Sequence, residues 1–368
     1  MPIVIIRRAD YDYETLKPLF YEMMDSLGGD RIQKHMRVVI KPNLLAPASP
    51  DRAIVTHPVI VKAAAEYVID KGARPQISDS PAVGSFERIL KESGIKEALG
   101  GLEVRYEEFK DSLSVNVGKP FENIDIAADA VEADFFINLP KLKTHTQMLM
   151  TLGIKNLFGC IVGLRKPEWH LRTGVNREMF AQLLVKIYKA VRPSVTIMDG
   201  ILSMQGQGPG KGGEPRHLGV LLGSKNAGAL DVAVCRMLGI PEEKVLTNRH
   251  AREQGLLSDD MTLDGTLPDI NDFRLPEIAP LVFGPRTMHG FMRRHLTQRP
   301  SCESNLCRLC GECWKYCPAK AIGHDKKNIH FDYDQCIRCY CCIEVCPYGA
   351  LKAVETLPGK VARKILKR

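Results

Sequence analysis

Ten of the twelve cysteines in this sequence fall within one short stretch, between Cys302 and Cys346. Thiols clustered at short, regular spacing, in a chain that starts without the features of a secretion signal, are typical of metal ligands rather than disulfides. Eight of them form two copies of the pattern C-x₂-C-x₂-C-x₃-C-P: Cys307, Cys310, Cys313 and Cys317 before Pro318, and Cys336, Cys339, Cys342 and Cys346 before Pro347. This spacing predicts the binding of iron–sulfur clusters.

The repeat predicts two [4Fe–4S] clusters with crossed ligation. Three thiolates two residues apart converge on one cubane, and the fourth Cys of each run crosses to the other cluster. Structural zinc does not fit, because it takes four ligands in C-x₂-C pairs, whereas this repeat offers triplets with a remote fourth thiol. The expected ligands are Cys307, Cys310, Cys313 and Cys346 for the first cluster, and Cys336, Cys339, Cys342 and Cys317 for the second.

Two cysteines of the stretch are left over from the repeat. Cys341 directly precedes the expected ligand Cys342, so it would point away from the cluster and is interpreted as a packed thiol. Cys302 is interpreted as a residue that flanks the cluster-binding segment. Either thiol could substitute for a ligand that is lost.

A second group of reactive side chains follows apolar runs in the first half of the chain. Ligands of open α/β sheets bind outside the carboxyl ends of the strands, so these side chains could converge on one crevice. We expect a cationic crevice for an anion such as a carboxylate, a phosphate or a phosphorylated cofactor; solvation of ordinary strand ends is the alternative. The expected ligand-binding residues are Lys41, Asn43, Lys155 and Asn156.

Four residues are candidates for catalysis. Lys141, Lys143 and His145 follow the apolar run Phe135–Leu139, and His145 is the first candidate for a general acid, with a surface histidine as the alternative. Cys160 is the fourth. A nearby lysine could make it a thiolate, but the sequence places no base beside it, so a buried core thiol is the favoured interpretation.

Residues 1 to about 285 alternate short β-rich runs with helical patterns, which predicts an α/β fold with a large, mostly parallel sheet flanked by helices. The expected strands are Ile3–Ile6, Val38–Lys41, Gln76–Ser78, Glu103–Tyr106, Phe135–Leu139, Val195–Met198 and Gly219–Leu222. The expected helices are Tyr13–Ser26, Pro58–Lys71, Phe86–Glu92, Arg177–Ala190 and Gly228–Leu238. The cysteine-rich segment is expected to form a small α+β domain.

Composition divides the 368 residues into four parts: an α/β domain at 1–285, a basic linker at 286–300, the two-cluster domain at 301–356 and a basic tail at 357–368. The boundary is placed by the Pro- and Asp-rich, aperiodic segment 264–285. The linker and tail carry much of the net charge of +8. The tail has no aromatic residue, which argues against nucleic-acid binding and leaves an acidic protein partner open.

The glycine-rich run 204–213 satisfies G-x-G-x-x-G formally, through Gly208, Gly210 and Gly213. A dinucleotide site is rejected because the run leads into an apolar strand, where the fingerprint needs a helix. A mobile loop over the crevice, or a flexible connector, is expected instead. No apolar run reaches the roughly 18 residues of a membrane span, and residues 1–10 lack the regions of a secretory signal, so a cytoplasmic protein is expected.

The sequence resembles two known families. The segment from Cys302 to about Val354 is similar to bacterial two-cluster ferredoxins. The larger part resembles the domain of unknown function 362 family, in the motifs V-V-I-K-P-N-L at Val38–Leu44, T-H-P at Thr56–Pro58, S-D-S-P at Ser78–Pro81, N-L-P-K-L-K-T-H at Asn138–His145 and G-I-K-N-L-F-G-C at Gly153–Cys160. The resemblance implies an iron–sulfur protein of oxidoreductase character.

The favoured hypothesis is an oxidoreductase that takes electrons from a redox partner protein, a ferredoxin or a reductase. Its two clusters would pass them to an anionic small-molecule substrate in the α/β domain. One alternative is a non-catalytic electron carrier or docking module that serves a partner enzyme. A further alternative gives the clusters a structural role in a protein that recognises anionic polymers.

Overall fold

The computed structural model describes residues 1–163, 165–173, 176–277 and 297–358. The strands of the larger part are β1 (Ile3–Arg8), β2 (Arg37–Pro42), β3 (Arg74–Ile77), β4 (Arg105–Tyr106), β5 (Ser112–Gly118), β6 (Glu122–Ala127), β7 (Phe135–Leu139), β8 (Lys141–His145), β9 (Leu149–Thr151), β10 (Val195–Gly206), β11 (Gly213–Ser224) and β12 (Thr262–Asp264). Its α-helices are α1 (Tyr13–Ser26), α2 (Pro58–Asp70), α3 (Phe86–Glu92), α4 (Ile95–Ala98), α5 (Ala128–Val131), α6 (Gly153–Asn156), α7 (Arg165–Thr173), α8 (Arg177–Val191), α9 (Ala227–Met237) and α10 (Leu246–Glu253).

Ten of these strands form one mixed sheet in the order β12-β1-β11-β10-β7-β2-β3-β4, with β8 paired to β10 and β9 paired to β8. The strands from β10 to β4 in this order are parallel to one another. Strand β11 runs antiparallel to both of its neighbours. The predicted α/β fold with a large, mostly parallel sheet is therefore confirmed.

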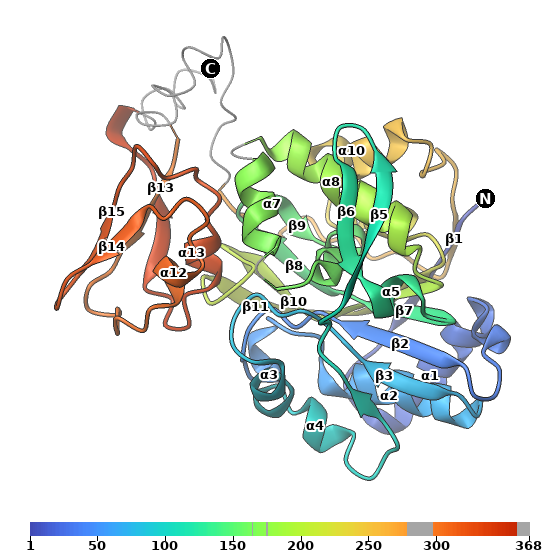
Figure 1. Ribbon diagram of the computed structural model, residues 1–368. Helices are drawn as coiled ribbons and strands as arrows, with labels where there is room; N and C mark the ends of the chain where they lie inside the picture. Colours follow the sequence, from blue (N-terminus) through green and yellow to red (C-terminus); the bar gives the residue numbers. More distant parts are fainter. Residues whose placement is uncertain (164, 174–175, 278–296, 359–368) are drawn as a thin grey trace.

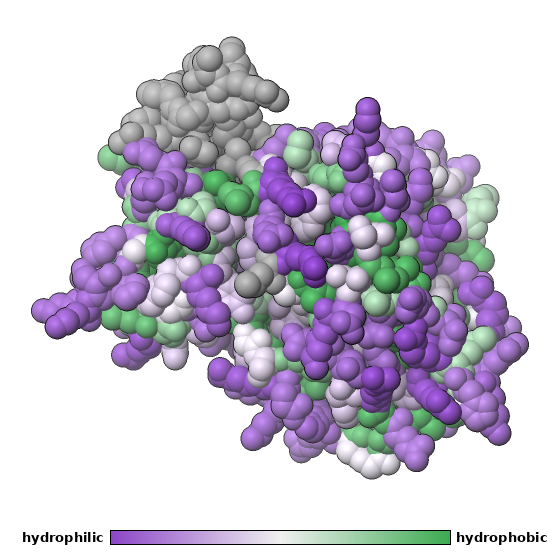
Figure 2. Space-filling model, viewed as in Figure 1, coloured by the Kyte–Doolittle hydropathy of each residue, from purple (hydrophilic) through white to green (hydrophobic). Residues whose placement is uncertain are grey.

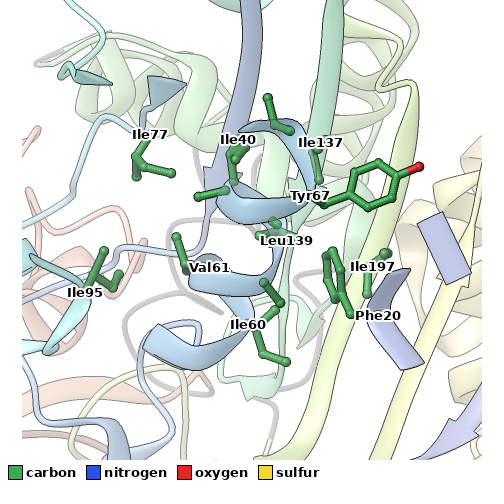
Figure 3. Packing of buried hydrophobic residues seen from close by; sticks show 14 of the residues in the cluster. Phe20, Ile40, Ile60, Val61, Tyr67, Ile77, Ile95, Ile137, Leu139 and Ile197 are labelled. Atoms are coloured by element: carbon green, nitrogen blue, oxygen red, sulfur yellow. The ribbon is translucent and has the colours of Figure 1, made fainter. Parts of the chain in front are cut away.

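Side chains alternate between the two faces along each strand, and apolar side chains lie on both faces of this sheet. Helices therefore cover both faces. Val38 and Ile40 of β2 pack against α1 to α4, whereas Val39 between them packs against α8 on the other face. Figure 3 shows the first layer, where Ile40 and Ile137 of two adjacent strands lie around Tyr67 of α2. Each fully buried aliphatic side chain of this kind contributes roughly 1.5–3 kcal/mol to folding.

The helix ends follow from local sequence. At α2, Pro58 occupies the first turn, where its missing N–H costs nothing, and the ring of His57 accepts a hydrogen bond from Val59 N. Gly72 follows that helix with a φ of 74°, a left-handed conformation that suits glycine. At the starts of α8 and α9, the side-chain oxygens of Asn176 and Asn226 accept hydrogen bonds from backbone N–H groups of the first turn.

The cysteine-rich segment forms a small unit beside the sheet, coloured orange to red in Figure 1. Its elements are β13 (Arg299–Cys302), α12 (Glu312–Lys315), β14 (Ile322–His324), β15 (Ile329–Phe331), α13 (Cys341–Glu344) and β16 (Leu351–Val354). β13 pairs with β16 and β14 with β15, both antiparallel. The predicted small α+β unit is thus present. Most of the predicted linker and tail lies outside the described residues.

Several elements differ from the sequence predictions. Strands β10 and β11 are twelve residues each and form a long hairpin, with the glycine-rich run as its turn. The hairpin of β5 and β6, made of alternating polar and apolar residues, was not predicted. Pro140 separates β7 from β8, so Lys141 and His145 lie on a strand that pairs with β10 and β9 rather than at the end of β7. On the face drawn in Figure 2 the surface is mostly hydrophilic, with scattered hydrophobic side chains.

Candidate functional site

A cavity of about 240 Å³ lies between the sheet and the iron–sulfur unit. The large domain contributes residues from the carboxyl ends of β2, β3 and β8 and from α6 and α7. The iron–sulfur unit contributes Tyr316 and the helix α13. The polar lining residues are Lys41, Asn43, Asp79, Ser80, Glu108, Lys143, His145, Thr151, Lys155, Asn156, Lys166, His170, Tyr316, Cys341 and Glu344. All four residues predicted to bind an anion line this one cavity.

Three of its four lysines are held by other groups of the protein. Lys41 Nζ lies 2.9 Å from Asp79 Oδ1 in a buried ion pair. Lys143 Nζ donates to Asn43 Oδ1 at 2.7 Å and to the Ile54 carbonyl at 2.6 Å. Lys166 Nζ donates to the carbonyl of Ser80. These contacts fix each ammonium at the cavity wall.

A chain of amides supports this wall. Asn43 Nδ2 donates to Asn156 Oδ1 at 2.8 Å, and Asn156 Nδ2 donates to Asn138 Oδ1 at 2.8 Å. Asn138 Nδ2 in turn donates to the carbonyl of Gly153 at 3.0 Å. The network ties β2, β7 and α6 together and orients the acceptor of Lys143.

Burial weakens the charge of these lysines. It lowers the pKa of Lys166 to about 8, against the opposing effect of Asp79. It also lowers the pKa of Lys143 and of Lys155, and for Lys143 the like charge of Lys155 adds to the effect. A bound anion would stabilise the charged form of each lysine, so the wall is suited to a negative ligand.

His145 has a defined tautomer. Its Nδ1 accepts hydrogen bonds from the backbone N–H groups of Gln147, at 3.1 Å, and Met148, at 3.3 Å. The proton is therefore assigned to Nε2, which lies 3.3 Å from Glu344 Oε1 of the iron–sulfur unit. Burial, and then the charge of Lys155, hold the pKa of His145 well below its usual value, so the ring is neutral.

Lys141 does not line the cavity. Its Nζ lies 2.7 Å from Asp199 Oδ2 and 2.9 Å from Tyr11 Oη, in a buried network on the neighbouring strand. Tyr11 also stacks on His57, with ring centroids 3.6 Å apart, and Asp199 accepts a hydrogen bond from the backbone N–H of His57. The network joins β8, β10 and the start of α2, which is a structural arrangement.

Cys160 is fully buried and is not among the residues that line the cavity. Burial raises the pKa of its thiol to about 12, in spite of the opposing charge of Lys41. The thiol is therefore protonated near neutral pH. This geometry favours the interpretation of Cys160 as a core residue.

The eight repeat cysteines gather in two sets. After burial, the pKa of Cys313 is raised by the neighbouring thiols of Cys310, Cys346 and Cys307. For Cys342 the largest such effects come from Cys339, Cys336 and Cys317. A single small cavity is lined by Cys317, Cys336, Cys339 and Cys342. These are the groupings that crossed ligation requires, and the ligand assignment itself stays a prediction.

The chemistry of each set fits a cubane cluster, because four thiols from two chain segments converge on one space. Among the described residues, no group of three or more His, Cys, Asp or Glu side chains is arranged to hold a single metal ion. A cubane binds each thiolate at a different iron and so holds the sulfurs further apart than one zinc ion does.

The iron–sulfur unit packs directly on the large domain. Val83 of the large domain belongs to the same apolar cluster as Cys313, Cys342 and Val345. The turn between β10 and β11 reaches the same place, where Pro209 lines the cavity. The glycine-rich run predicted as a loop over the crevice is therefore a hairpin turn beside it.

Sequence reasoning did not select seven of the polar cavity residues: Glu108, Thr151, Lys166, His170, Tyr316, Cys341 and Glu344. Lys166 and His170 lie four residues apart on α7, a spacing that places them on one helix face. That spacing could have identified Lys166 and His170 as a pair of polar side chains on one side of a helix. Glu344 lies between two cysteines of the cluster motif. A residue in such a spacer is not recognisable from the sequence as part of a cavity wall.

The fold and site define an α/β protein with a ferredoxin-type unit that binds [4Fe–4S] clusters. The model of the 4Fe-4S dicluster domain matches residues 306–350, and the model described as domain of unknown function (DUF362) matches residues 38–236. The chain belongs to the DUF362 family and is an iron–sulfur protein of electron-transfer type.

The proteins that this chain is similar to are consistent with an iron–sulfur protein of electron-transfer type. The thylakoid-associated protein sll1697 of Synechocystis sp. is 33% identical over 297 residues, which cover 78% of this chain and 92% of that protein. The electron transport protein HydN of Escherichia coli is 40% identical over 53 residues, 14% of this chain and 30% of that protein. The pyruvate synthase subunit PorD of Methanocaldococcus jannaschii is 37% identical over 60 residues, 16% of this chain and 70% of that protein.

Within the described part of the chain, no helix is both long and apolar enough to cross a membrane. The printed name of the Synechocystis relative associates that protein with thylakoids. The cytoplasmic localisation expected from the sequence stays a prediction.

Proposed function

We propose that this protein is an oxidoreductase in which two [4Fe–4S] clusters pass electrons to a small anion held in the cavity between its domains. The observation that carries the proposal is the position of α13. This helix contains the expected ligand Cys342, and its residues Cys341 and Glu344 form one wall of the cavity. Cluster-binding and ligand-binding residues are thus adjacent.

The exposure of the cysteines supports different roles for the two clusters. The first set includes the exposed Cys310 as well as the buried Cys313, whereas Cys339 and Cys342 of the second set are both buried. A redox partner protein would reach the first set from solvent, and the second set lies next to the ligand. When bound, the clusters would supply single electrons.

The large domain supplies binding and a hydrogen-bond donor. Lys143 and Lys155 attract the anion, and Asn43 orients Lys143. The neutral ring of His145 is the proposed hydrogen-bond donor to the ligand, because its Nδ1 accepts from two backbone N–H groups and its Nε2–H lies at the cavity wall near Glu344. The lining of the cavity is partly apolar, which favours displacement of water by the ligand.

Cluster content and ligation are tested first, on anaerobically reconstituted protein. We expect about eight iron and eight sulfide per chain, because each of two cubanes contains four of each. Cys317→Ala is expected to damage the second cluster, and Cys346→Ala the first, as seen by electron paramagnetic resonance of the reduced protein. Loss of the cluster bound by the mutated residue's own triplet would contradict crossed ligation.

Activity is tested by adding small organic anions to the reduced protein and following reoxidation of the clusters. An anion that is a substrate should reoxidise the parent protein and should act much more slowly on His145→Gln, with the clusters intact. Lys110→Met, which alters an exposed lysine that does not line the cavity, is the control. If the reduced protein passed electrons to a partner protein but to none of the anions, the electron-carrier alternative would replace the enzyme.

A further inference from the structure

Lys155 differs from the other three lysines of the cavity. Among the residues that the structure describes, its ammonium has no hydrogen-bond or ion-pair partner, whereas Lys41, Lys143 and Lys166 each have at least one. Burial lowers the pKa of Lys155, and the charge of Glu344, which lines the same cavity, opposes this effect. A buried cation left without a partner is costly, which indicates a site completed by a ligand.

Two more polar groups of the same wall are incomplete. Thr151 Oγ1 and His170 Nδ1 are buried and have no hydrogen-bond partner in the described part of the chain, and both residues line the cavity with Lys155. Burial, and then the charge of Lys155, lowers the pKa of His170. One free cation beside two polar groups is a site built for an anion.

The size and charge of the site restrict the ligand. A cavity of about 240 Å³ is below the usual range of roughly 300–1,000 Å³ for small-molecule sites, so the ligand is small. A single free ammonium matches a single negative charge. Phosphate is usually held by several free donors or by arginine, and no arginine lines this cavity among the described residues.

Lys155 lines the same cavity as Cys341, a residue of the iron–sulfur unit. Cys341 directly precedes Cys342 in α13. A charge at Lys155 therefore acts on the second cluster through a short path of buried side chains, where screening by water and salt is weak.

We infer that Lys155, with Thr151 and His170, forms a subsite for a small monocarboxylate, and that the bound carboxylate and the second cluster are electrostatically coupled. The inference rests on the proposed function for the position of that cluster. A carboxylate neutralises Lys155 and makes addition of an electron to the cluster less favourable. By linkage, reduction of the cluster weakens carboxylate binding by the same factor. Reduction of the cluster would then promote release of the product.

Acetate is a suitable probe, because it carries the carboxylate and cannot itself accept electrons under these conditions. On the reconstituted full-length chain, a redox titration followed by electron paramagnetic resonance should show that acetate lowers the potential of one cluster. The affinity for acetate should be lower for the reduced protein than for the oxidised protein. Phosphate at the same concentration should produce a smaller shift.

Lys155→Met and Lys155→Gln are each expected to weaken acetate binding roughly 10- to 150-fold, the range for a lost charged hydrogen bond, and to abolish the acetate-dependent shift. Lys110→Met should behave as the parent. Unchanged acetate binding in both Lys155 variants, a parent potential insensitive to acetate, or a larger effect of phosphate would overturn the inference. Because acetate is not turned over, these results are independent of whether any anion proves to be a substrate.

Discussion

At the scale of single residues, two lysines separated by fourteen positions have opposite environments. Lys141 is neutralised by Asp199 within a closed network, whereas Lys155 faces a cavity without a partner among the described residues. Both residues are polar groups near strand or helix ends, so sequence position alone does not separate them. The difference arises from what lies opposite each side chain in the folded protein.

The Lys141→Met variant is expected to lose stability rather than specific binding. Removing the ammonium leaves Asp199 as a buried, uncompensated carboxylate, which costs about 3–5 kcal/mol. Denaturant unfolding of parent and variant measures the loss. Lys155→Met serves as the matched comparison and should change the free energy of unfolding much less. Equal stability of Lys141→Met and the parent would show that the Asp199 network is not structural.

At the scale of elements, the short helix α6 depends on a carboxyl group from another helix. Asp231 of α9 accepts hydrogen bonds from the backbone N–H groups of Gly153, at 2.7 Å, and Ile154, at 3.1 Å. These are the first residues of α6, which carries Lys155 and Asn156 into the cavity. The position of the proposed anion site thus depends on a contact from a remote helix.

Asp231 also gives a pH dependence of stability. Burial raises its pKa from 3.8 to about 8, so the folded protein holds a proton that the unfolded chain releases above pH 3.8. Its contribution to stability is therefore complete below about pH 4 and is lost as pH rises toward 8. Urea unfolding across this range should show a decline that is reduced in Asp231→Asn. A decline of equal slope in the variant would assign the effect to other groups.

The sequence predicted much of the element pattern, and the errors have physical causes. Buried parallel strands such as β2 and β7 contain continuous apolar runs, and the end signals Pro58 and Gly72 are local, so both can be recognised without the fold. The strand β8 could not be predicted, because its residues are mostly polar and pair with β10 only through long-range contacts. For the same reason, the ion pair between Lys141 and Asp199 could not be predicted from the sequence.

The candidate site was predictable in part. Lys41, Asn43, Lys143, His145, Lys155 and Asn156 meet at one cavity, as expected for polar groups at the carboxyl ends of strands. Glu344 and Cys341 could not be selected, since they come from the other domain and their role depends on how the two domains pack. Packing between domains leaves no short-range pattern in a sequence.

At the scale of the whole molecule, the two domains share an apolar cluster and a cavity. A chain shortened by residues 297–368 should keep its sheet, because all ten strands lie in the remaining part. It should bind acetate more weakly than the full chain, since the wall formed by Tyr316, Cys341 and Glu344 is removed. Circular dichroism and acetate titration check the two expectations. Loss of the folded sheet would show that the iron–sulfur unit is needed for folding.

The shared cavity also limits how the iron–sulfur unit can be exchanged. Three of its wall residues, Tyr316, Cys341 and Glu344, occupy spacer positions within the cysteine motifs. In an independent electron carrier those spacers need only accommodate the clusters, whereas here they must also match a surface of the partner domain. A chimera with the spacers of a free-standing ferredoxin should therefore retain its clusters and lose the cavity between the domains. Covariation between these spacers and the residues of β8 and α6 in homologous chains would be evidence that the two surfaces must match.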